Sequence, residues 1–253
     1  MNFLLHHDFA MTELEVELEL RPIGAVGAML PDLWRMADRK VRPRDLGKSE
    51  DARPSYAPAL RALLGGIDHH LQIDRWFHGS RVFTEGERTL RQRLLETKSP
   101  KLLLFAHPAW EMCLDGALLR ESGVTKTASL LRDALDRAEA LLERAADLHH
   151  FDRRERSLAD RFRFGARMAR IVSAGRDGSL FEDYLSADGI SRRLAGMRMA
   201  FGFEKPHAEE LDRWARALAE AVDMADSALK ELRQERADSP SSDASRAPPG
   251  SAH

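Results

Sequence analysis

Histidine and aspartate residues occur at a regular four-residue spacing in the segment GGIDHHLQIDRWFH. His70, Asp74 and His78 occupy positions i, i+4 and i+8 of this stretch, among apolar residues. In a helix of about 3.6 residues per turn, side chains at this spacing drift by only about 40° per step, so the three line one stripe. Such a stripe indicates either a ligand site or the polar face of a helix.

The same spacing recurs in HPAWEMCLDG, at His107, Glu111 and Asp115. The intervening residues, such as Trp110 and Leu114, are again mostly apolar. A buried carboxylate or imidazole without a partner costs several kcal/mol, so six such groups on two apolar helices require one another or a cation. Metal coordination satisfies all of them together, and the two triplets therefore predict a metal centre.

Two further residues extend the predicted ligand set: His6 in MNFLLHH, and Asp32, which follows Pro31 in an apolar segment. Imidazole and carboxylate ligands without thiolate suit Mn, Fe, Zn or Mg, and we expect a divalent Mn, Fe or Zn cofactor of one or two ions. Such ions lower the pKa of bound water and stabilise charge on a phosphoryl oxygen, as phosphoester hydrolysis requires. We expect Asp32 or Asp74 to orient or deprotonate that water.

Arginine residues are concentrated in RRERSLADRFRFGARMARI and in SRRLAGMR. Guanidinium groups bind phosphate and carboxylate through paired hydrogen bonds, so these segments predict a basic patch for a phosphate or an acidic partner. A solvated charged face is the alternative interpretation. The candidate phosphate ligands are Arg75, Arg163, Arg167 and Arg193.

Other residues have simpler interpretations. His69 falls on a different face of its helix from His70 and is expected to be solvated. Cys113 lies between Met112 and Leu114 without a basic neighbour, so we expect an unreactive core thiol. For the two triplets themselves, a hydrogen-bonded polar network in the core is the alternative to metal ligation.

The elements that position these residues are expected to be the helices of one domain. Few β-branched runs and many Ala, Leu, Arg and Glu residues predict an all-α, single-domain fold over residues 1–236. Segment 237–253 is predicted to be disordered, because it has almost no large apolar residue. The expected helices cover about Ile23–Ala37, Pro58–His78, 84–98, 102–122, Lys126–Leu148, Glu155–Ser173, 179–186, 190–201 and His207–Arg236.

Charge and cysteine content exclude several classes of protein. With 39 basic and 41 acidic residues, the net charge of −2 gives no signature of nucleic-acid binding. One cysteine excludes a disulfide framework and fits a reducing compartment. No stretch reaches the roughly 18 apolar residues of a spanning helix, and no secretion signal is evident, so we expect a cytoplasmic protein without membrane contact.

Four motifs occur in the order typical of one known family: MNFLLH, LPDLWR, GIDHHLQID and FEDYLSADGISRRLAGMRMAF. Together they resemble the acyl carrier protein phosphodiesterases, helical relatives of the HD-domain metal-dependent phosphohydrolases. The family's opening MNFLAH, an aspartate that ends a Gly/Leu-rich helix and the pattern G-I-x-x-H-x-x-I-D all have counterparts here. The matched positions, which the resemblance associates with metal chemistry, are His6, Asp32, Gly66, Ile67, His70, Ile73 and Asp74.

The resemblance implies an HD-like helical bundle and a metal-dependent phosphodiesterase. Its implied partner is a phosphopantetheine-bearing acyl carrier protein or a phosphorylated small molecule. The chain also departs from the family pattern: FHGS stands where the family has Thr-Asp-Ser-His, so His78 replaces an aspartate and Ser80 replaces the later histidine. A pair of aspartates followed by His is likewise replaced by the second triplet. These departures indicate a divergent branch.

Two other functions fit parts of the pattern. Carboxylate and imidazole ligands on bundled helices also describe di-iron redox proteins, although the triplets have a spacing of four instead of the three of Glu-x-x-His pairs. A non-catalytic binding module would use the Arg-rich face to hold an acidic partner. Iron-dependent absorption and oxygen consumption would favour the first function, and a purified protein without metal would favour the second.

Overall fold

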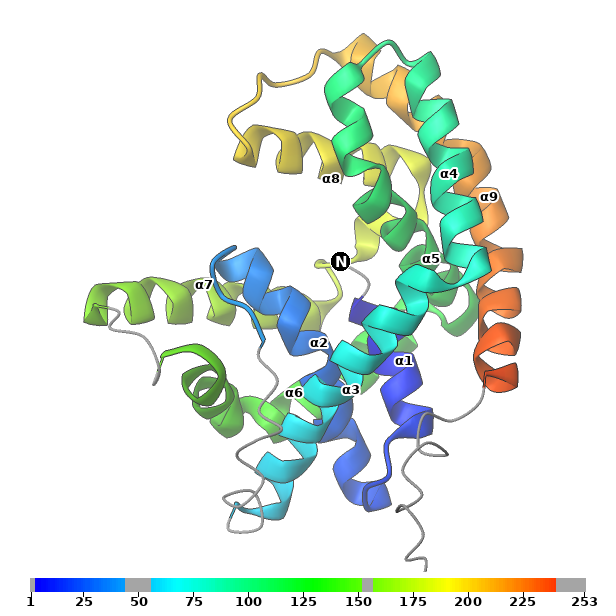
Figure 1. Cartoon of the computed structure of the whole chain (residues 1–253). Coiled ribbons are helices and arrows are strands. Elements are labelled where there is room, and N and C mark those ends of the chain that lie inside the picture. Colours follow the sequence, from blue (N-terminus) through cyan, green and yellow to red (C-terminus); the bar gives the residue numbers. More distant parts are fainter. Residues whose placement is uncertain (1–2, 44–55, 152–156, 240–253) are drawn as a thin grey trace, which may run out of the picture.

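The described part of the chain is all-helical. The computed structural model describes residues 3–43, 56–151 and 157–239, which form nine α-helices and no strand. This confirms the all-α fold expected from the composition. The helices in Figure 1 are α1 (Phe3–Glu13), α2 (Arg21–Ala37), α3 (Pro58–Gly79), α4 (Arg81–Glu96), α5 (Ala106–Ser122), α6 (Val124–Ala146), α7 (Leu158–Asp177), α8 (Ala187–Ala200) and α9 (Ala208–Asp238). Shorter turns are η1 (Leu18–Leu20), η3 (Pro100–Phe105), η4 (Asp147–Phe151) and η5 (Glu182–Leu185).

Helices α1 and α7 differ most from the sequence-based expectation, and α7 ends at Asp177 instead of at the expected Ser173. The sequence pattern does not predict α1, because apolar residues such as Phe3, Leu4 and Phe9 are buried on several of its faces and leave no amphipathic period. The segment predicted to be disordered begins inside α9, which continues to Asp238. Residues 240–253 lie outside the described residues.

Serine side chains cap three of the helices at their first turn. The hydroxyl oxygens of Ser80, Ser157 and Ser186 accept backbone N–H groups at the starts of α4, α7 and α8, at 3.2, 3.2 and 3.1 Å. Such caps satisfy N–H groups that lack a partner within the helix. Ser80 stands where the acyl carrier protein phosphodiesterases, which the motifs resemble, have histidine. Here its hydroxyl caps the start of α4.

Helices α2 and α3 pack with their backbones in direct contact. A Cβ atom at Gly66 of α3 would lie 1.8 Å from the carbonyl oxygen of Gly24, and one at Gly27 of α2 would lie 2.0 Å from a carbonyl oxygen of α3. Real Cβ atoms do not approach so closely, so only glycine fits at these positions. The contact fixes the separation of the two helices that carry Asp32 and His70.

Helix α5 is the central helix of the fold. It packs against α1, α4, α6, α8 and α9, and its Trp110 lies 2.2 Å from where a Cβ at Gly86 of α4 would be. Among the described residues, Lys101–Ser122 is long and apolar enough to cross a membrane by length and composition, but 78% of its apolar window is buried inside the fold. Cys113 is buried here, and burial raises its pKa to about 12, in agreement with the expected unreactive thiol.

A buried carboxylate joins α1 to α5. Asp115 of α5 is fully buried, and its carboxylate oxygens accept hydrogen bonds from the backbone N–H groups of Leu4 (3.3 Å) and Leu5 (3.0 Å) in the first turn of α1. These N–H groups have no partner within the helix and lie at its positive end. Burial raises the pKa of Asp115 well above its ordinary value, while the hydrogen bonds from α1 oppose that shift. Asp115 therefore positions α1.

The last turns of α9 are bound to α1 and α3. Glu13 accepts hydrogen bonds from Arg236 Nε (3.0 Å) and Nη2 (2.7 Å), and the Arg236 guanidinium lies over the Trp76 ring. His69 Nε2 lies 3.2 Å from the same carboxylate. The expectation that His69 is solvated is therefore wrong: it is 9% exposed, because its face of α3 packs against α1.

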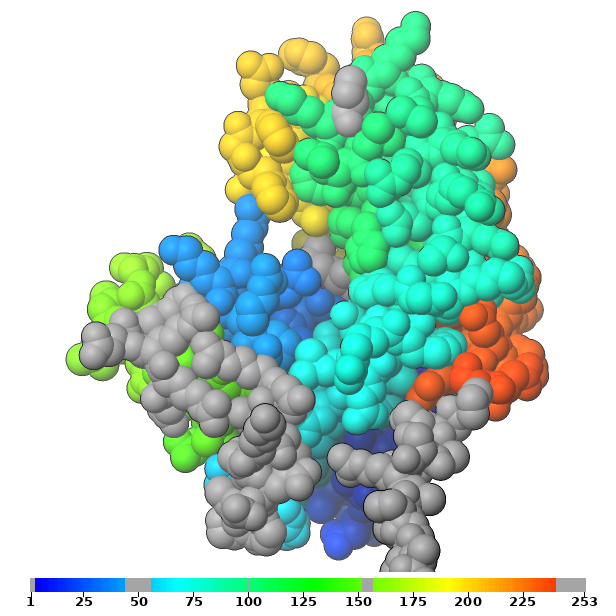
Figure 2. Space-filling model, in the orientation of Figure 1, coloured from blue at the N-terminus to red at the C-terminus, as the bar shows by residue number. Residues whose placement is uncertain are grey.

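The surface of the molecule is hollowed between α8 and the end of α2 (Figure 2). Arg39, which follows α2, joins the two sides of this hollow, since its guanidinium carbon lies 3.7 Å from the centre of the Phe201 ring. Phe201 follows α8 and also packs edge-on against Phe105 of η3. One cation–π contact thus connects the α2 side of the molecule to the α8 side.

Replacing Gly66 by alanine is expected to destabilise the fold by about 1–3 kcal/mol, because the added methyl group forces α2 and α3 apart. Gly65→Ala is the matched control, since a Cβ at Gly65 would meet nothing within 4 Å. Alanine there should favour the helix by about 0.5–1 kcal/mol. Urea unfolding of both variants measures the two free energies, and equal stabilities would contradict the backbone contact.

Neutralising Glu13 is expected to reduce stability in a pH-dependent way. Burial alone would raise the pKa of Glu13, but hydrogen bonds from His69 and Arg236 lower it from 4.5 to about 2. A carboxyl group with a depressed folded-state pKa stabilises the fold above its unfolded pKa, and this contribution is lost as pH falls from about 5 to about 2. Glu13→Gln should therefore lower the free energy of unfolding by about 1–2 kcal/mol at pH 7, and by less in acid.

Urea unfolding between pH 7 and the lowest pH at which the chain stays folded measures the Glu13 contribution. The control is Glu15→Gln, an exposed neighbour, which should leave stability nearly unchanged. If the difference between Glu13→Gln and the unaltered chain does not shrink below about pH 5, the ion pair is not its source.

Candidate metal centre

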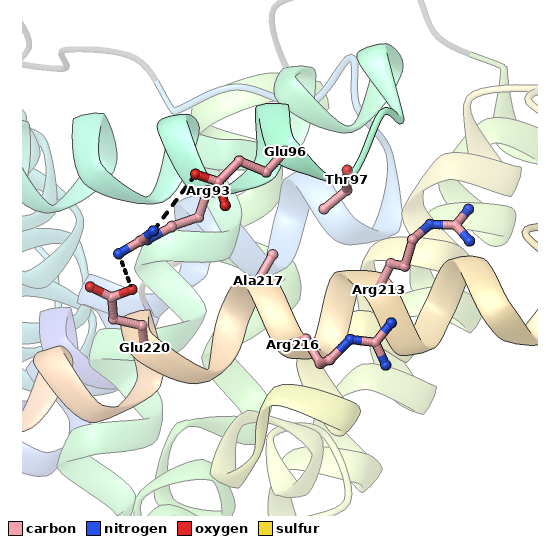
Figure 3. A pocket seen from close by; sticks show the side chains of 7 residues that line it. All are labelled: Arg93, Glu96, Thr97, Arg213, Arg216, Ala217 and Glu220. Atoms are coloured by element: carbon pink, nitrogen blue, oxygen red, sulfur yellow. Dashed lines mark ion pairs between the residues drawn. The ribbon is translucent and has the colours of Figure 1, made fainter.

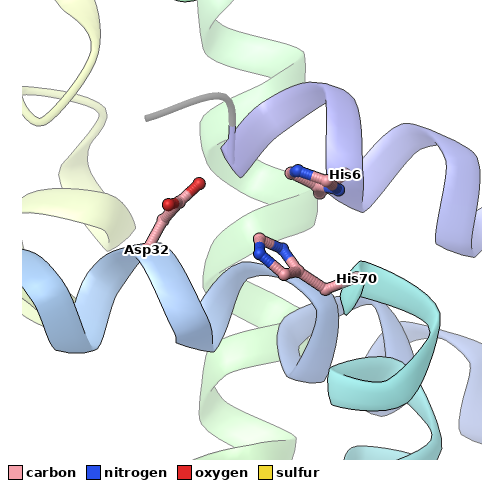
Figure 4. Close-up of side chains that lie close together, drawn as sticks. All are labelled: His6, Asp32 and His70. Atoms are coloured by element: carbon pink, nitrogen blue, oxygen red, sulfur yellow. The ribbon is translucent and has the colours of Figure 1, made fainter. Parts of the chain in front are cut away.

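Three helices bring His6, Asp32 and His70 together in the interior. The ligand atoms of these three residues all lie within 4.8 Å of one another. The residues come from α1, α2 and α3 and are 2%, 9% and 5% exposed. Figure 4 shows the three side chains turned toward one another. We call this group the inner cluster.

The inner cluster fits a divalent cation. Protein ligands at about 2.0–2.2 Å from an ion lie about 3–4 Å from one another, so only a small closure of the present spacing is needed. His6 Nδ1 is buried and has no hydrogen-bond partner among the described residues. A buried polar atom without a partner is costly, and a cation is one group that would satisfy it.

The His70 imidazole has the orientation and charge of a metal ligand. Its Nδ1 lies 2.8 Å from the carbonyl oxygen of Ala28, so Nδ1 donates a proton there and Nε2 keeps its lone pair. Metal-binding histidines are commonly held in this way by an oxygen acceptor on the other ring nitrogen. Burial lowers the pKa of His70 to about 4, which keeps the ring neutral at physiological pH.

Asp74 lies between the inner cluster and a second group of histidines. Its Oδ1 is 3.8 Å from His6 Nε2 and 3.5 Å from His78 Nδ1. Burial opposes its ionisation, but the surrounding imidazoles hold the pKa of Asp74 below its ordinary value. The Asp74 side chain is 40% exposed, so this carboxylate is accessible to water.

The second group consists of His78, His107 and Glu111, whose ligand atoms also lie within 4.8 Å of one another. Glu111 Oε1 is 3.3 Å from His78 Nε2 and 3.4 Å from His107 Nε2. The imidazoles are 31% and 40% exposed, whereas the Glu111 side chain is 6% exposed. We call this group the outer cluster.

Glu87 of α4 supports the outer cluster and was not among the residues expected from the sequence. Its Oε2 lies 2.9 Å from His107 Nδ1, which directs His107 Nε2 toward Glu111. Burial opposes charge on both His107 and Glu111, but their mutual hydrogen bond raises the pKa of His107 and helps to hold that of Glu111 well below its ordinary value. Glu87 gives no signal in the sequence, because α4 carries many similar Glu and Arg residues.

The structure does not bring Asp115 into either cluster. Its carboxylate is bound to the backbone of α1. The physical reason is the drift of about 40° per step at four-residue spacing, which carries the i+8 side chain about 80° away from the first. Along α5, His107 and Glu111 face the outer cluster while Asp115 faces α1.

The four candidate phosphate ligands bind protein groups instead of either cluster. Within the described residues, Arg75 donates to Leu71 O, Arg163 pairs with Asp160, Arg167 donates to Ala37 O, and Arg193 binds Ser179 O, Leu180 O and Asp183. A phosphate contact from any of them remains a prediction.

A pocket of about 380 Å³ lies elsewhere, between α4 and α9. Figure 3 shows Arg93 paired with Glu96 and Glu220 on one side of it, and Arg213 and Arg216 extending from α9 on the other. None of its lining residues belongs to the inner or outer cluster. The candidate site is therefore located by its ligand atoms and not by this pocket.

Comparisons of the chain with protein-family models, with curated proteins and with solved structures found no match in any of the three. The function must therefore be inferred from the residues of the site.

Adding Mn²⁺ to the chelator-treated chain is expected to raise its melting temperature by about 5–10 °C at 100 times the dissociation constant, because the ion binds only the folded state. His70→Gln should reduce this shift, since it deletes an inner-cluster ligand. His207→Gln, which alters an exposed histidine outside both clusters, is the control and should retain it. No shift in the unaltered chain, or an equal shift in His70→Gln, would contradict metal binding at the inner cluster.

Proposed function

We propose that the chain is a divalent-metal-dependent hydrolase of phosphoesters or phosphodiesters. The observation that carries this proposal is the inner cluster, in which His6, Asp32 and His70 converge from three helices in the interior. Two imidazoles and one carboxylate are a ligand set for Mn, Fe or Zn. An ion with open coordination positions in such a set would be suited to metal-assisted hydrolysis.

The chain's own residues would divide the work of the reaction. The bound ion supplies a more acidic water and neutralises charge on the phosphoryl group. His6, His70 and Asp32 would hold the ion, and the Ala28 carbonyl would keep the His70 ring in its ligand tautomer. Asp74 is ionised and 40% exposed next to His6, so it is placed to accept a proton from the attacking water.

A sequence resemblance supports a phosphodiester as the substrate. The motifs around His6, Asp32, His70 and Asp74 resemble those of the acyl carrier protein phosphodiesterases. A phosphopantetheine-bearing acyl carrier protein or a phosphorylated small molecule is therefore the proposed partner. The single buried Cys113 supports action in the cytoplasm, where a free thiol persists.

A second candidate function is a binding module for an acidic partner. On α7, Leu158 and Phe162 are 82% and 83% exposed, four residues apart, on a helix rich in arginine. Exposed apolar side chains beside positive charge are typical of protein-binding surfaces. This function would be favoured if the purified chain holds no metal and hydrolyses no ester.

Hydrolysis of bis(p-nitrophenyl) phosphate tests the proposed function. The chain loaded with Mn²⁺, Fe²⁺ or Zn²⁺ should release p-nitrophenolate, and Asp74→Asn should lower kcat by about 100-fold or more, because it removes the proton acceptor. His207→Gln should keep full activity. Undiminished turnover in chelator-treated protein or in Asp74→Asn would contradict the proposal, and oxygen consumption by iron-loaded protein without ester hydrolysis would replace it with redox chemistry.

A further inference from the structure

The outer cluster contains a complete ligand set of its own. It consists of two imidazoles and one carboxylate, as the inner cluster does, but from α3 and α5. We propose that His78, His107 and Glu111 bind a second divalent cation, separate from the ion of the inner cluster and more readily exchanged. This inference deepens the proposed function, since it adds a second ion beside the same centre.

The ligand atoms of the outer cluster converge on one point. His78 Nε2 and His107 Nε2 face the same oxygen of Glu111, at 3.3 and 3.4 Å. The two rings lie 4.6 Å apart between their centres. Atoms at these separations are within the range of ligands that share one ion. A cation among them would contact all three side chains with little movement.

Carboxylates face the outer nitrogens of both imidazoles. Glu87 Oε2 lies 2.9 Å from His107 Nδ1, and Asp74 Oδ1 lies 3.5 Å from His78 Nδ1. A carboxylate on the second ring nitrogen is the usual support of a metal-binding histidine, because it fixes the ring and increases its basicity. This arrangement is a second observation, independent of the convergence of ligand atoms, that favours a cation.

The two clusters differ in exposure and are linked through Asp74. The outer imidazoles are 31% and 40% exposed, whereas every inner ligand is below 10%. The same Asp74 oxygen faces His6 on one side and His78 on the other. A cation held by the outer cluster would therefore be accessible to solvent, and Asp74 lies between the residues that would hold the two ions.

The outer cluster does not come with the family resemblance. His78 stands where that family has aspartate, and His107 belongs to a triplet that replaces another family motif. The outer site is thus inferred from this chain's own geometry.

Counting bound Mn²⁺ tests the second site without measuring turnover. The full chain, without a histidine tag and treated with chelator, is titrated with Mn²⁺ by calorimetry, and bound metal is counted by plasma mass spectrometry after desalting. Two equivalents are expected for the unaltered chain and for the control His207→Gln. His107→Gln should retain one equivalent, His70→Gln should lose the other, and the double variant should bind none. Circular dichroism of each variant shows whether it stays folded, which the exposure of His107 favours.

Two further measurements test the second site: the affinity of its ion when Glu87 is replaced, and the rate at which a chelator removes that ion. Glu87→Ala should weaken the second ion's affinity by about 10-fold and leave the first unchanged, because it removes only the support of His107. Brief exposure to chelator should remove first the equivalent that depends on His107. One equivalent in the unaltered chain, or two in His107→Gln, would overturn the inference. Binding of two equivalents without ester hydrolysis would contradict only the proposed function. Ester hydrolysis with one bound ion would contradict only the second site.

Discussion

Between α2 and α3 no side chain separates the backbones at Gly24, Gly27 and Gly66. This constraint brings the Ala28 carbonyl within hydrogen-bonding distance of His70 and holds Asp32 close to the same ring. Helix α1 buries its apolar side chains in the core, and a carboxylate from α5 also holds its first turn. The direct backbone contact between α2 and α3 thus determines how close the helices that carry Asp32 and His70 lie.

Desolvation explains why the polar groups of this core are arranged as they are. Each buried imidazole or carboxylate has to be neutralised, hydrogen-bonded or matched with an opposite charge. His70 meets this requirement by staying neutral. Asp115 meets it by accepting hydrogen bonds from two backbone N–H groups of α1. Glu111 meets it by facing two imidazoles. The core therefore contains a polar band from His6 to His107 within an otherwise apolar bundle.

Much of the fold follows from local sequence pattern, and less of the site does. Composition and periodicity predict the all-α fold and most helices, and four-residue spacing singles out His70, His78, His107 and Glu111. The spacing alone does not predict which of these residues belong to the inner cluster and which to the outer cluster. That assignment depends on where α1, α2 and α5 lie around α3. The same reason accounts for Asp115, whose partner is a backbone far away in the sequence.

Cys113 is expected to be unreactive toward thiol-specific labelling reagents. As the single cysteine of the chain, buried in α5 with a pKa of about 12, it offers almost no thiolate to a maleimide or spin label. Cysteines introduced at exposed positions of α2 and α8, such as Arg35 and Met199, would react alone. Labels there would report the distance between the end of α2 and the end of α8, with the native cysteine left in place.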